Sequence, residues 1–322
     1  MKPVSPWGLG CAQLGNLYHA ISDETAEATV RRAWDEGIRY FDTAPHYGLG
    51  LSERRLGAAL GAYPREEFVL STKIGRVLEP DPAGAAERDA QGFDVPAAFR
   101  RRWDFSRDGV LRSLADSLGR LGLDRVDLVY VHDPDDHFDD AVNGAFPALL
   151  ELREQGVVGA IGAGMNRTAP LAEFVRRFDL DAVMVAGRYT LLDQPALDEL
   201  LPLCEKRGVA VMAAGAFNGG ILATAEPGAT YDYATAPPEL VEKAVRIAAV
   251  CARHGVELPQ AALALPATHP AVASVVVGAH DPDQVSLNLR RSRTPVPEVL
   301  WTDLIAEGLL RPDAVVTCGG RP

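Results

Sequence analysis

A carboxylate, a phenol and an ammonium group lie at the ends of two apolar segments, and together they can move a proton. Asp42 ends an apolar segment at residues 39–42, and Tyr47 follows it closely. Lys73 comes directly after a second apolar segment, at residues 68–72. Because a nearby positive charge favours the phenolate, Lys73 is expected to lower the pKa of Tyr47 from about 10. Asp42 would hold the lysine in place and keep it charged, so these residues predict acid–base chemistry near neutral pH.

Two histidines extend this group. His132 ends a third apolar segment, at residues 126–132, and His46 directly precedes Tyr47. A lone histidine is more often a structural residue, but at a strand end His132 would donate a hydrogen bond to a substrate oxygen and orient it. For His46 we expect a place in the wall of the substrate pocket, with simple packing as the alternative.

These side chains are positioned by short apolar segments that alternate with amphipathic helical stretches. Strands are expected at residues 7–11, 39–42, 68–72, 126–132, 158–161, 182–185, 209–213 and 274–277. Helices are expected at residues 23–36, 52–60, 107–121, 146–155, 169–178, 195–207, 238–254 and 282–289. Eight strands that are each followed by a helix predict an α/β protein with a parallel sheet closed into a barrel, the (β/α)8 or TIM barrel. An open, doubly wound sheet would need a glycine-rich turn after the first strand, whereas Gly8 and Gly10 lie within that strand.

Three long connections are expected to cover the C-terminal face of the barrel, where such enzymes place their sites. They span residues 75–105, 218–236 and 292–322. We expect one domain over residues 1–322, because α/β barrels commonly have this length.

The composition limits the partners. The net charge of −12 argues against nucleic acid and acidic membrane surfaces, because their phosphates would be repelled. The four cysteines show no metal-ligand spacing and no disulfide pattern, so no metal site is expected. We find no signal peptide and no apolar run long enough to span a bilayer. We therefore expect a cytoplasmic monomer or homodimer that acts on a small molecule.

The four residues Asp42, Tyr47, Lys73 and His132 resemble, in order and context, the catalytic tetrad of the aldo-keto reductases. The segments at 42–48, 52–57 and 117–122 also resemble that family, and the resemblance covers nearly the whole chain. It is closest to the subgroup that oxidises aldoses at C1, the D-threo-aldose 1-dehydrogenase or L-fucose dehydrogenase type. The segments that carry this closer match are 8–10, 14–18, 47–54, 132–134 and 188–193.

The resemblance implies an oxidoreductase that oxidises a sugar at C1 to the lactone, with Tyr47 as general acid and base. A nicotinamide dinucleotide, NAD or NADP, is implied as the hydride acceptor, because no side chain can accept a hydride. Reduction of aldehydes or ketones, or oxidation of pyridoxal, on the same four residues is the alternative. A cofactor-sensing binding subunit of this fold is a further alternative, against which the acidic charge argues.

The resemblance also implies the cofactor contacts. The loop expected to wrap the pyrophosphate comprises Gly215, Ala216, Phe217, Asn218 and Gly219. The residues expected at the adenosine phosphate end, where a helix begins, are Gly278, His280, Asp281, Gln284 and Asn288. Relatives that prefer NADP usually carry Arg or Lys here, whereas a carboxylate would repel the 2′-phosphate and accept hydrogen bonds from the ribose, so NAD is favoured. Arg290 and Arg291 could restore NADP binding if the helix turns them inward.

The remaining contacts follow the family less closely. Asn166 is expected to hold the nicotinamide carboxamide from a shifted position, and Tyr189 to stack on the nicotinamide ring. A sugar ring has apolar patches and many hydroxyls, so it suits an aromatic platform with hydrogen-bonding groups. The residues expected to bind substrate are Trp7, Tyr18, His46 and His132.

Overall fold

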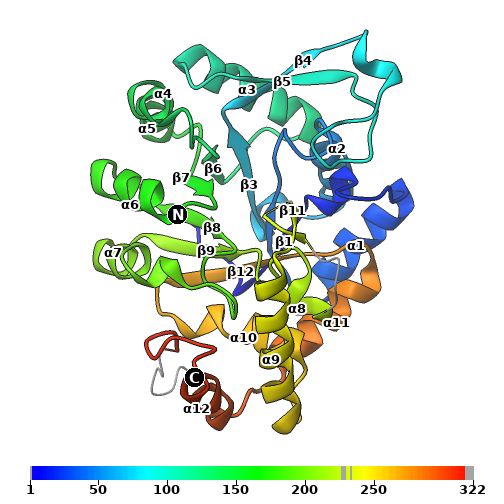
Figure 1. The fold of residues 1–322 in the computed structure, drawn as a ribbon. Helices are drawn as coiled ribbons and strands as arrows, with labels where there is room; N and C mark the ends of the chain where they lie inside the picture. The colour runs from blue at the N-terminus through cyan, green and yellow to red at the C-terminus, as the bar shows by residue number, and fades with distance from the viewer. Residues whose placement is uncertain (1, 226–229, 233, 316–322) are drawn as a thin grey trace.

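The computed structural model describes residues 2–225, 230–232 and 234–315. Within these residues, eight parallel strands form a closed barrel in the order β1-β12-β9-β8-β7-β6-β3-β2 (Figure 1). The strands are β1 (Trp7–Gly10), β2 (Tyr40–Asp42), β3 (Val69–Ile74), β6 (Leu128–His132), β7 (Ala160–Met165), β8 (Ala182–Ala186), β9 (Ala210–Ala214) and β12 (Val272–Gly278). The predicted (β/α)8 barrel is confirmed, and Gly8 and Gly10 lie within a strand as expected.

Helices surround the barrel (Figure 1). They are α1 (Asp23–Asp35), α2 (Leu51–Leu60), α3 (Arg107–Leu121), α4 (Phe138–Asp140), α5 (Phe146–Glu154), α6 (Thr168–Arg177), α7 (Leu200–Arg207), α8 (Ile221–Thr224), α9 (Pro238–Arg253), α10 (Leu258–Ala264), α11 (Pro282–Arg293) and α12 (Glu298–Ala306). The helix predicted at 195–207 is wrong in part, because a 3₁₀ turn at Pro195–Leu197 precedes α7.

Polar caps fix where several helices begin. Ser22 accepts a hydrogen bond from the amide of Thr25 at the start of α1, and Ser106 accepts one from Gly109 at the start of α3. Each such cap stabilises the protein by about 1 kcal/mol relative to alanine. Helix α10, which the sequence analysis did not predict, begins with a capping box between Glu257 and Gln260. That pair, with Pro259 between its two residues in the first turn, was the available signal for this helix.

Large side chains fill the interior of the barrel. Tyr40 and Tyr130 lie there with Met184 and Met212, fully or almost fully buried. The hydroxyl of Tyr40 lies 3.0 Å from Oγ of Ser71 and 3.2 Å from the hydroxyl of Tyr130, so the buried polar atoms have partners. The interior below the C-terminal face is therefore a packed core, and chemistry has to take place on top of it.

The connection after β3 contains structure that the sequence analysis did not predict. Strands β4 (Arg76–Pro80) and β5 (Phe99–Trp103) pair antiparallel and form a hairpin. Figure 1 shows this hairpin beyond the C-terminal end of β3, far from α12. A second, shorter hairpin, β10 (Thr230–Tyr231) and β11 (Ala234–Thr235), follows β9. The expectation of a long connection at 292–322 is wrong in part, because α11 extends to Arg293 and α12 lies within this range. Residues 316–322 of the connection lie outside the described residues.

No helix in the part of the chain that the structure describes is both long and apolar enough to cross a membrane. Over the same residues, no group of three or more His, Cys, Asp and Glu side chains could hold a metal ion.

The close approach of α2 and α3 gives a stability prediction. A Cβ added at Gly57 would overlap the backbone carbonyl of Leu121, so Gly57→Ala is expected to lower the free energy of unfolding by about 1–3 kcal/mol. Gly119, on α3, has open space around its Cα, so Gly119→Ala is expected to raise it by about 0.5–1 kcal/mol. Urea unfolding of both variants measures the difference, and equal effects of the same sign would contradict this packing.

Candidate active site

A buried ammonium group organises the C-terminal end of the barrel. Nζ of Lys73 donates hydrogen bonds to Oδ2 of Asp42 at 2.6 Å, to the carbonyl of Thr43 at 2.9 Å and to the hydroxyl of Tyr47 at 3.1 Å. The side chains of Lys73 and Asp42 are 2% and 3% exposed. All three donors of the ammonium are thus used, and its charge is balanced by one carboxylate.

The strand register explains this meeting. Asp42, the last residue of β2, lies beside Ser71 of β3, and Oγ of Ser71 donates a 2.7 Å hydrogen bond to its Oδ1. Lys73 lies two residues further along β3, on the same face of the strand as Ser71. Both carboxylate oxygens of Asp42 are therefore held, one by each of these side chains.

The loop after β2 brings Tyr47 over the lysine. Residues 48–50 all have positive φ angles, 61°, 52° and 82°. A Cβ at Gly48 would overlap the backbone carbonyl of Gly15, so only glycine allows the two loops to approach this closely. Nζ of Lys73 also lies 4.7 Å from the centroid of the Tyr47 ring.

His132 lies on the other side of Tyr47. It ends β6, it is almost fully buried, and its ring meets the Tyr47 ring edge to face at 5.9 Å. Burial, with Arg76 and Lys73 nearby, holds the pKa of His132 well below its usual range. The structure therefore brings together all four residues of the predicted tetrad, with a neutral imidazole that has one N–H to donate.

The expectation of a lowered pKa for Tyr47 is wrong. Burial, followed by the charges of Asp42 and Asp133, raises the pKa of the phenol well above its usual value. The lysine is too well neutralised by Asp42, 2.6 Å away, to offset these effects. Tyr47 thus holds its proton at neutral pH and is ready to donate it.

His46 lies in the same group. Its ring is 5.1 Å from Phe93 and 5.7 Å from His132, and its buried Nδ1 has no hydrogen-bond partner in the structure. Burial and the neighbouring cations hold the pKa of His46 well below its usual range. Packing alone would leave Nδ1 unsatisfied, so a place in the wall of the substrate pocket stays the prediction for His46.

Three residues of the β4–β5 connection approach this group, although sequence reasoning singled out only the connection as a whole. Phe93 packs against Tyr47 and His46. Arg101 donates a 3.0 Å hydrogen bond to the carbonyl of His46, and it is held by Asp89 in a bidentate ion pair. Arg76 is close enough to His46 and His132 for its charge to help lower the pKa of both. Their position directly after the strand of Lys73 was the available signal.

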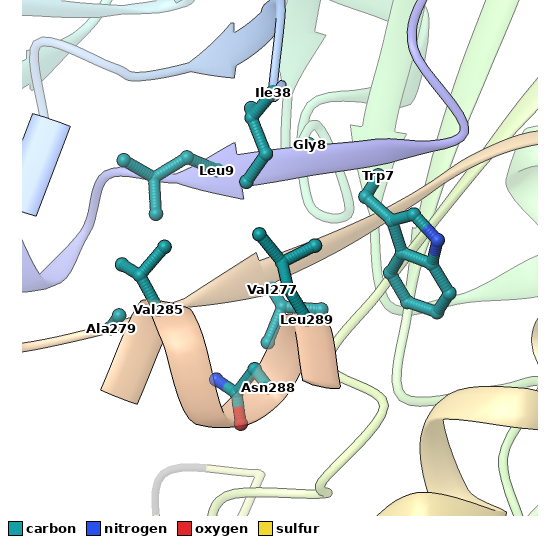
Figure 2. A pocket seen from close by; sticks show the side chains of 9 residues that line it. All are labelled: Trp7, Gly8, Leu9, Ile38, Val277, Ala279, Val285, Asn288 and Leu289. Carbon is teal, nitrogen blue, oxygen red and sulfur yellow. The ribbon is translucent and has the colours of Figure 1, made fainter. Parts of the chain in front are cut away.

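Two of the residues expected to bind substrate lie at different ends of the barrel. Tyr18 is half exposed, and its amide donates a hydrogen bond to Gly92 in the connection that also carries Phe93. Trp7 is the first residue of β1, whose last residue, Gly10, is level with Asp42. Figure 2 shows Trp7 beside an apolar pocket between β1, β12 and α11. Its expected role is therefore wrong, because the indole lies at the opposite end of the strand from Tyr47.

The loop after β9 has the form expected of a phosphate cradle. Gly215, Asn218 and Gly219 have positive φ angles of 67°, 46° and 68°. Asn218 donates a 3.1 Å hydrogen bond to the carbonyl of Gly187, while its buried Oδ1 has no partner in the structure. Ala216 and Phe217 complete the turn between these residues. Backbone amides of such a turn can donate to phosphate oxygens, whereas the unsatisfied Oδ1 of Asn218 accepts, so it fits a hydrogen-bond donor of a bound ligand.

The residues expected at the adenosine end gather at the start of α11. Asp281 accepts a 2.8 Å hydrogen bond from the amide of Gln284, whose side chain accepts one from His280. The His280 ring stacks on His19 at 3.9 Å, and Gly278 packs against the side chain of Gln13.

Other side chains of α11 lie away from its first turn. Asn288 borders the apolar pocket of Figure 2. The guanidinium of Arg291 pairs with Glu257, so it is engaged outside the site that would hold a 2′-phosphate.

The two nicotinamide contacts differ. Asn166 directly follows β7, whose neighbour in the barrel, β6, carries His132. Tyr189 is fully buried in the core, where its hydroxyl donates a 2.9 Å hydrogen bond to Ala314. That hydroxyl also lies 3.2 Å from Thr268, which precedes the amino-terminal end of β12. The structure thus does not bring Tyr189 to the tetrad. The expectation that its ring stacks on the nicotinamide is therefore wrong.

Comparison with known proteins gives a consistent result. The model of the Aldo/keto reductase family matches residues 6–303. The chain is 50% identical over 314 residues to a D-threo-aldose 1-dehydrogenase of Pseudomonas sp, covering 95% of this chain and 94% of that protein. It is 40% identical over 325 residues to a pyridoxal 4-dehydrogenase of Microbacterium luteolum, covering 95% of each. The holo form of an aldo-keto reductase from Bacillus halodurans has a TM-score of 0.72 at 26% identity, covering 99% of this chain and 96% of that one.

The barrel and these similarities define an NAD(P)-dependent oxidoreductase. The chain belongs to the aldo/keto reductase family.

The buried histidine beside Tyr47 gives a prediction on pH. The unfolded chain protonates His46 below about pH 6.5, whereas the folded protein holds it neutral. The unfolded state therefore binds more protons as the pH falls, and the free energy of unfolding decreases by up to about 1.4 kcal/mol per pH unit for this residue. Urea unfolding at about pH 7.5 and pH 5 should show a smaller decrease for His46→Asn than for the wild type.

A variant of an exposed histidine, His19→Asn, controls for the removal of a histidine from the unfolded chain. Equal decreases in the wild type and His46→Asn would contradict a neutral, buried His46.

Proposed function

We propose that this protein oxidises an aldose at C1 to the lactone, with NAD as the preferred cofactor. The observation that carries the proposal is the buried hydrogen-bonded group Asp42–Lys73–Tyr47 beside His132. The similarity over nearly full length to a D-threo-aldose 1-dehydrogenase supports the substrate class.

In this proposal Tyr47 exchanges a proton with the oxygen on C1. Oxidation breaks the O–H and C–H bonds at C1 and forms the C=O bond of the lactone. The bound nicotinamide supplies the hydride acceptor. The proton passes to Tyr47 as the phenolate, and His132 donates a hydrogen bond that orients the same oxygen. Because the pKa of Tyr47 is raised, the rate of oxidation should increase with rising pH, as more of Tyr47 becomes phenolate. Reduction uses the phenol, which already dominates at neutral pH.

The cofactor would lie across the loops that follow β7, β9 and β12. The loop with Gly215, Asn218 and Gly219 would hold the pyrophosphate, and Asn166 would hold the carboxamide. The start of α11, with Asp281, would hold the adenosine ribose. Backbone amides in the turn after β9 and at the start of α11 can donate to phosphate oxygens, and the unsatisfied Oδ1 of Asn218 can accept from a donor of the cofactor.

A second candidate is favoured by the similarity to a pyridoxal 4-dehydrogenase. Oxidation of pyridoxal, or reduction of aldehydes, would use the same proton transfer by Tyr47. A panel of aldoses, pyridoxal and simple aldehydes, with NAD(H) and NADP(H) supplied separately, distinguishes the candidates. Turnover of pyridoxal or aldehydes without any aldose would overturn the aldose proposal.

Replacement of the phenol tests the chemistry. Tyr47→Phe is expected to lower kcat for the best substrate by about 10²–10⁴-fold, because it removes the proton acceptor. Dinucleotide binding, followed by quenching of tryptophan fluorescence, should persist. Tyr63→Phe, on the outer surface against Trp34, is the matched control. Near wild-type turnover by Tyr47→Phe would rule out this mechanism.

The charge at the start of α11 tests the cofactor preference. Asp281→Ser keeps an oxygen that can cap the helix but removes the negative charge. We expect the ratio of kcat/KM with NADP to that with NAD to rise by about tenfold, or about 1.4 kcal/mol. Asp283→Ser, in the first turn of the same helix, is the control. An unchanged ratio in Asp281→Ser would show that this carboxylate does not select the cofactor.

A further inference from the structure

Asp133 lies beside the imidazole that is expected to orient the substrate oxygen. It directly follows His132, and its Oδ2 is 3.4 Å from Nε2 of His132. Its backbone has a φ of 43°, and its amide donates a 3.0 Å hydrogen bond to the carbonyl of Gly164. The turn therefore directs this carboxylate towards the tetrad and fixes it there.

An arginine from the β4–β5 hairpin holds the carboxylate. Nη2 of Arg76 donates a 2.6 Å hydrogen bond to Oδ2 of Asp133, and the side chain of Arg76 is 11% exposed. The guanidinium also lies over the ring of Trp103, 4.5 Å from its centroid. The ion pair thus joins the hairpin to the end of β6 next to the group that would perform the chemistry.

The chemistry of this pair favours a ligand that carries hydroxyl groups. A carboxylate can accept about four hydrogen bonds, so one arginine leaves it able to accept more. The side chain is 32% exposed, and burial raises the pKa of Asp133. A hydrogen bond from the ligand to such a partly buried carboxylate stabilises the complex more than one to a fully hydrated carboxylate. A sugar brings such donors next to C1, whereas a simple aldehyde brings none.

We propose that Asp133, held by Arg76, determines specificity by accepting a hydrogen bond from a ring hydroxyl of the substrate. The enzyme would thereby select polyhydroxylated substrates over simple aldehydes. This inference rests on the proposed function and names the residue that recognises the substrate class.

Two variants suit the backbone of this position. Asp133→Asn tolerates the positive φ and removes the charge, and Asp133→Gly adopts the same φ without a side chain. Alanine would add backbone strain and confuse the result. Asp136→Asn, on the same loop but exposed, is the matched control. Thermal unfolding and dinucleotide binding establish that each variant is folded.

The experiment compares an aldose with an aldehyde that has no hydroxyl group, such as benzaldehyde in the reductive direction. For the aldose, Asp133→Gly is expected to lower kcat/KM by about 10–100-fold, mainly through KM, because the oxygen that accepts the hydrogen bond from the substrate is removed. Asp133→Asn keeps an accepting oxygen without the charge, so its loss should be smaller. For benzaldehyde the change should stay within about threefold. The control should resemble the wild type with both substrates.

Monodeoxy analogues of the aldose identify the hydroxyl. At least one analogue should be a poorer substrate for the wild type by about tenfold, and this penalty should largely disappear in Asp133→Gly, which has no accepting side chain. Equal losses for aldose and aldehyde, or unchanged deoxy penalties, would overturn the proposed role of Asp133 but leave the proposed function intact. If the wild type turned over no aldose, the proposed function and this inference would both fall.

Discussion

The ion pair between Lys73 and Asp42 is the interaction on which the site depends. Both charges are withdrawn from water, and each would cost several kcal/mol if left unpaired. A hydrophobic pair of similar size would usually be as stable, so stability alone does not explain it. What the pair does provide is a fixed donor, 3.1 Å from the hydroxyl of Tyr47. This distance is set by three features: the register of β2 and β3, the Ser71 hydrogen bond and the loop at 48–50.

The second constraint comes from outside the barrel. The interior below the tetrad is filled by tyrosine and methionine side chains, so the barrel itself offers little room for a ligand. The β4–β5 connection supplies the walls instead: Phe93 packs on Tyr47, and Arg101 fixes the backbone of His46. The charge distribution there also explains the protonation states. Cations and burial keep His46 and His132 neutral, while burial keeps the proton on Tyr47.

Much of this arrangement could be predicted from the sequence. Parallel strands end on one face, so Asp42, Lys73 and His132 had to meet once the alternation of strands and helices was recognised. The hairpin could not be predicted, because β5 consists largely of arginines without an apolar alternation. Trp7 was misplaced because its aromatic character was considered without the direction of its strand. The pKa of Tyr47 was misjudged because its neighbour Lys73 was counted as a free charge, although Asp42 neutralises it.

The pairing of charges across the hairpin restricts how this site can change. Arg101 pairs with Asp89 inside the connection, whereas Arg76 pairs with Asp133 of the barrel. A hairpin taken from another protein would therefore leave a carboxylate of the barrel without its arginine. New substrate ranges on this scaffold would have to evolve, or be engineered, through matched changes in the hairpin and at the end of β6. The ion pair couples the two segments, although more than fifty residues of chain separate Arg76 from Asp133.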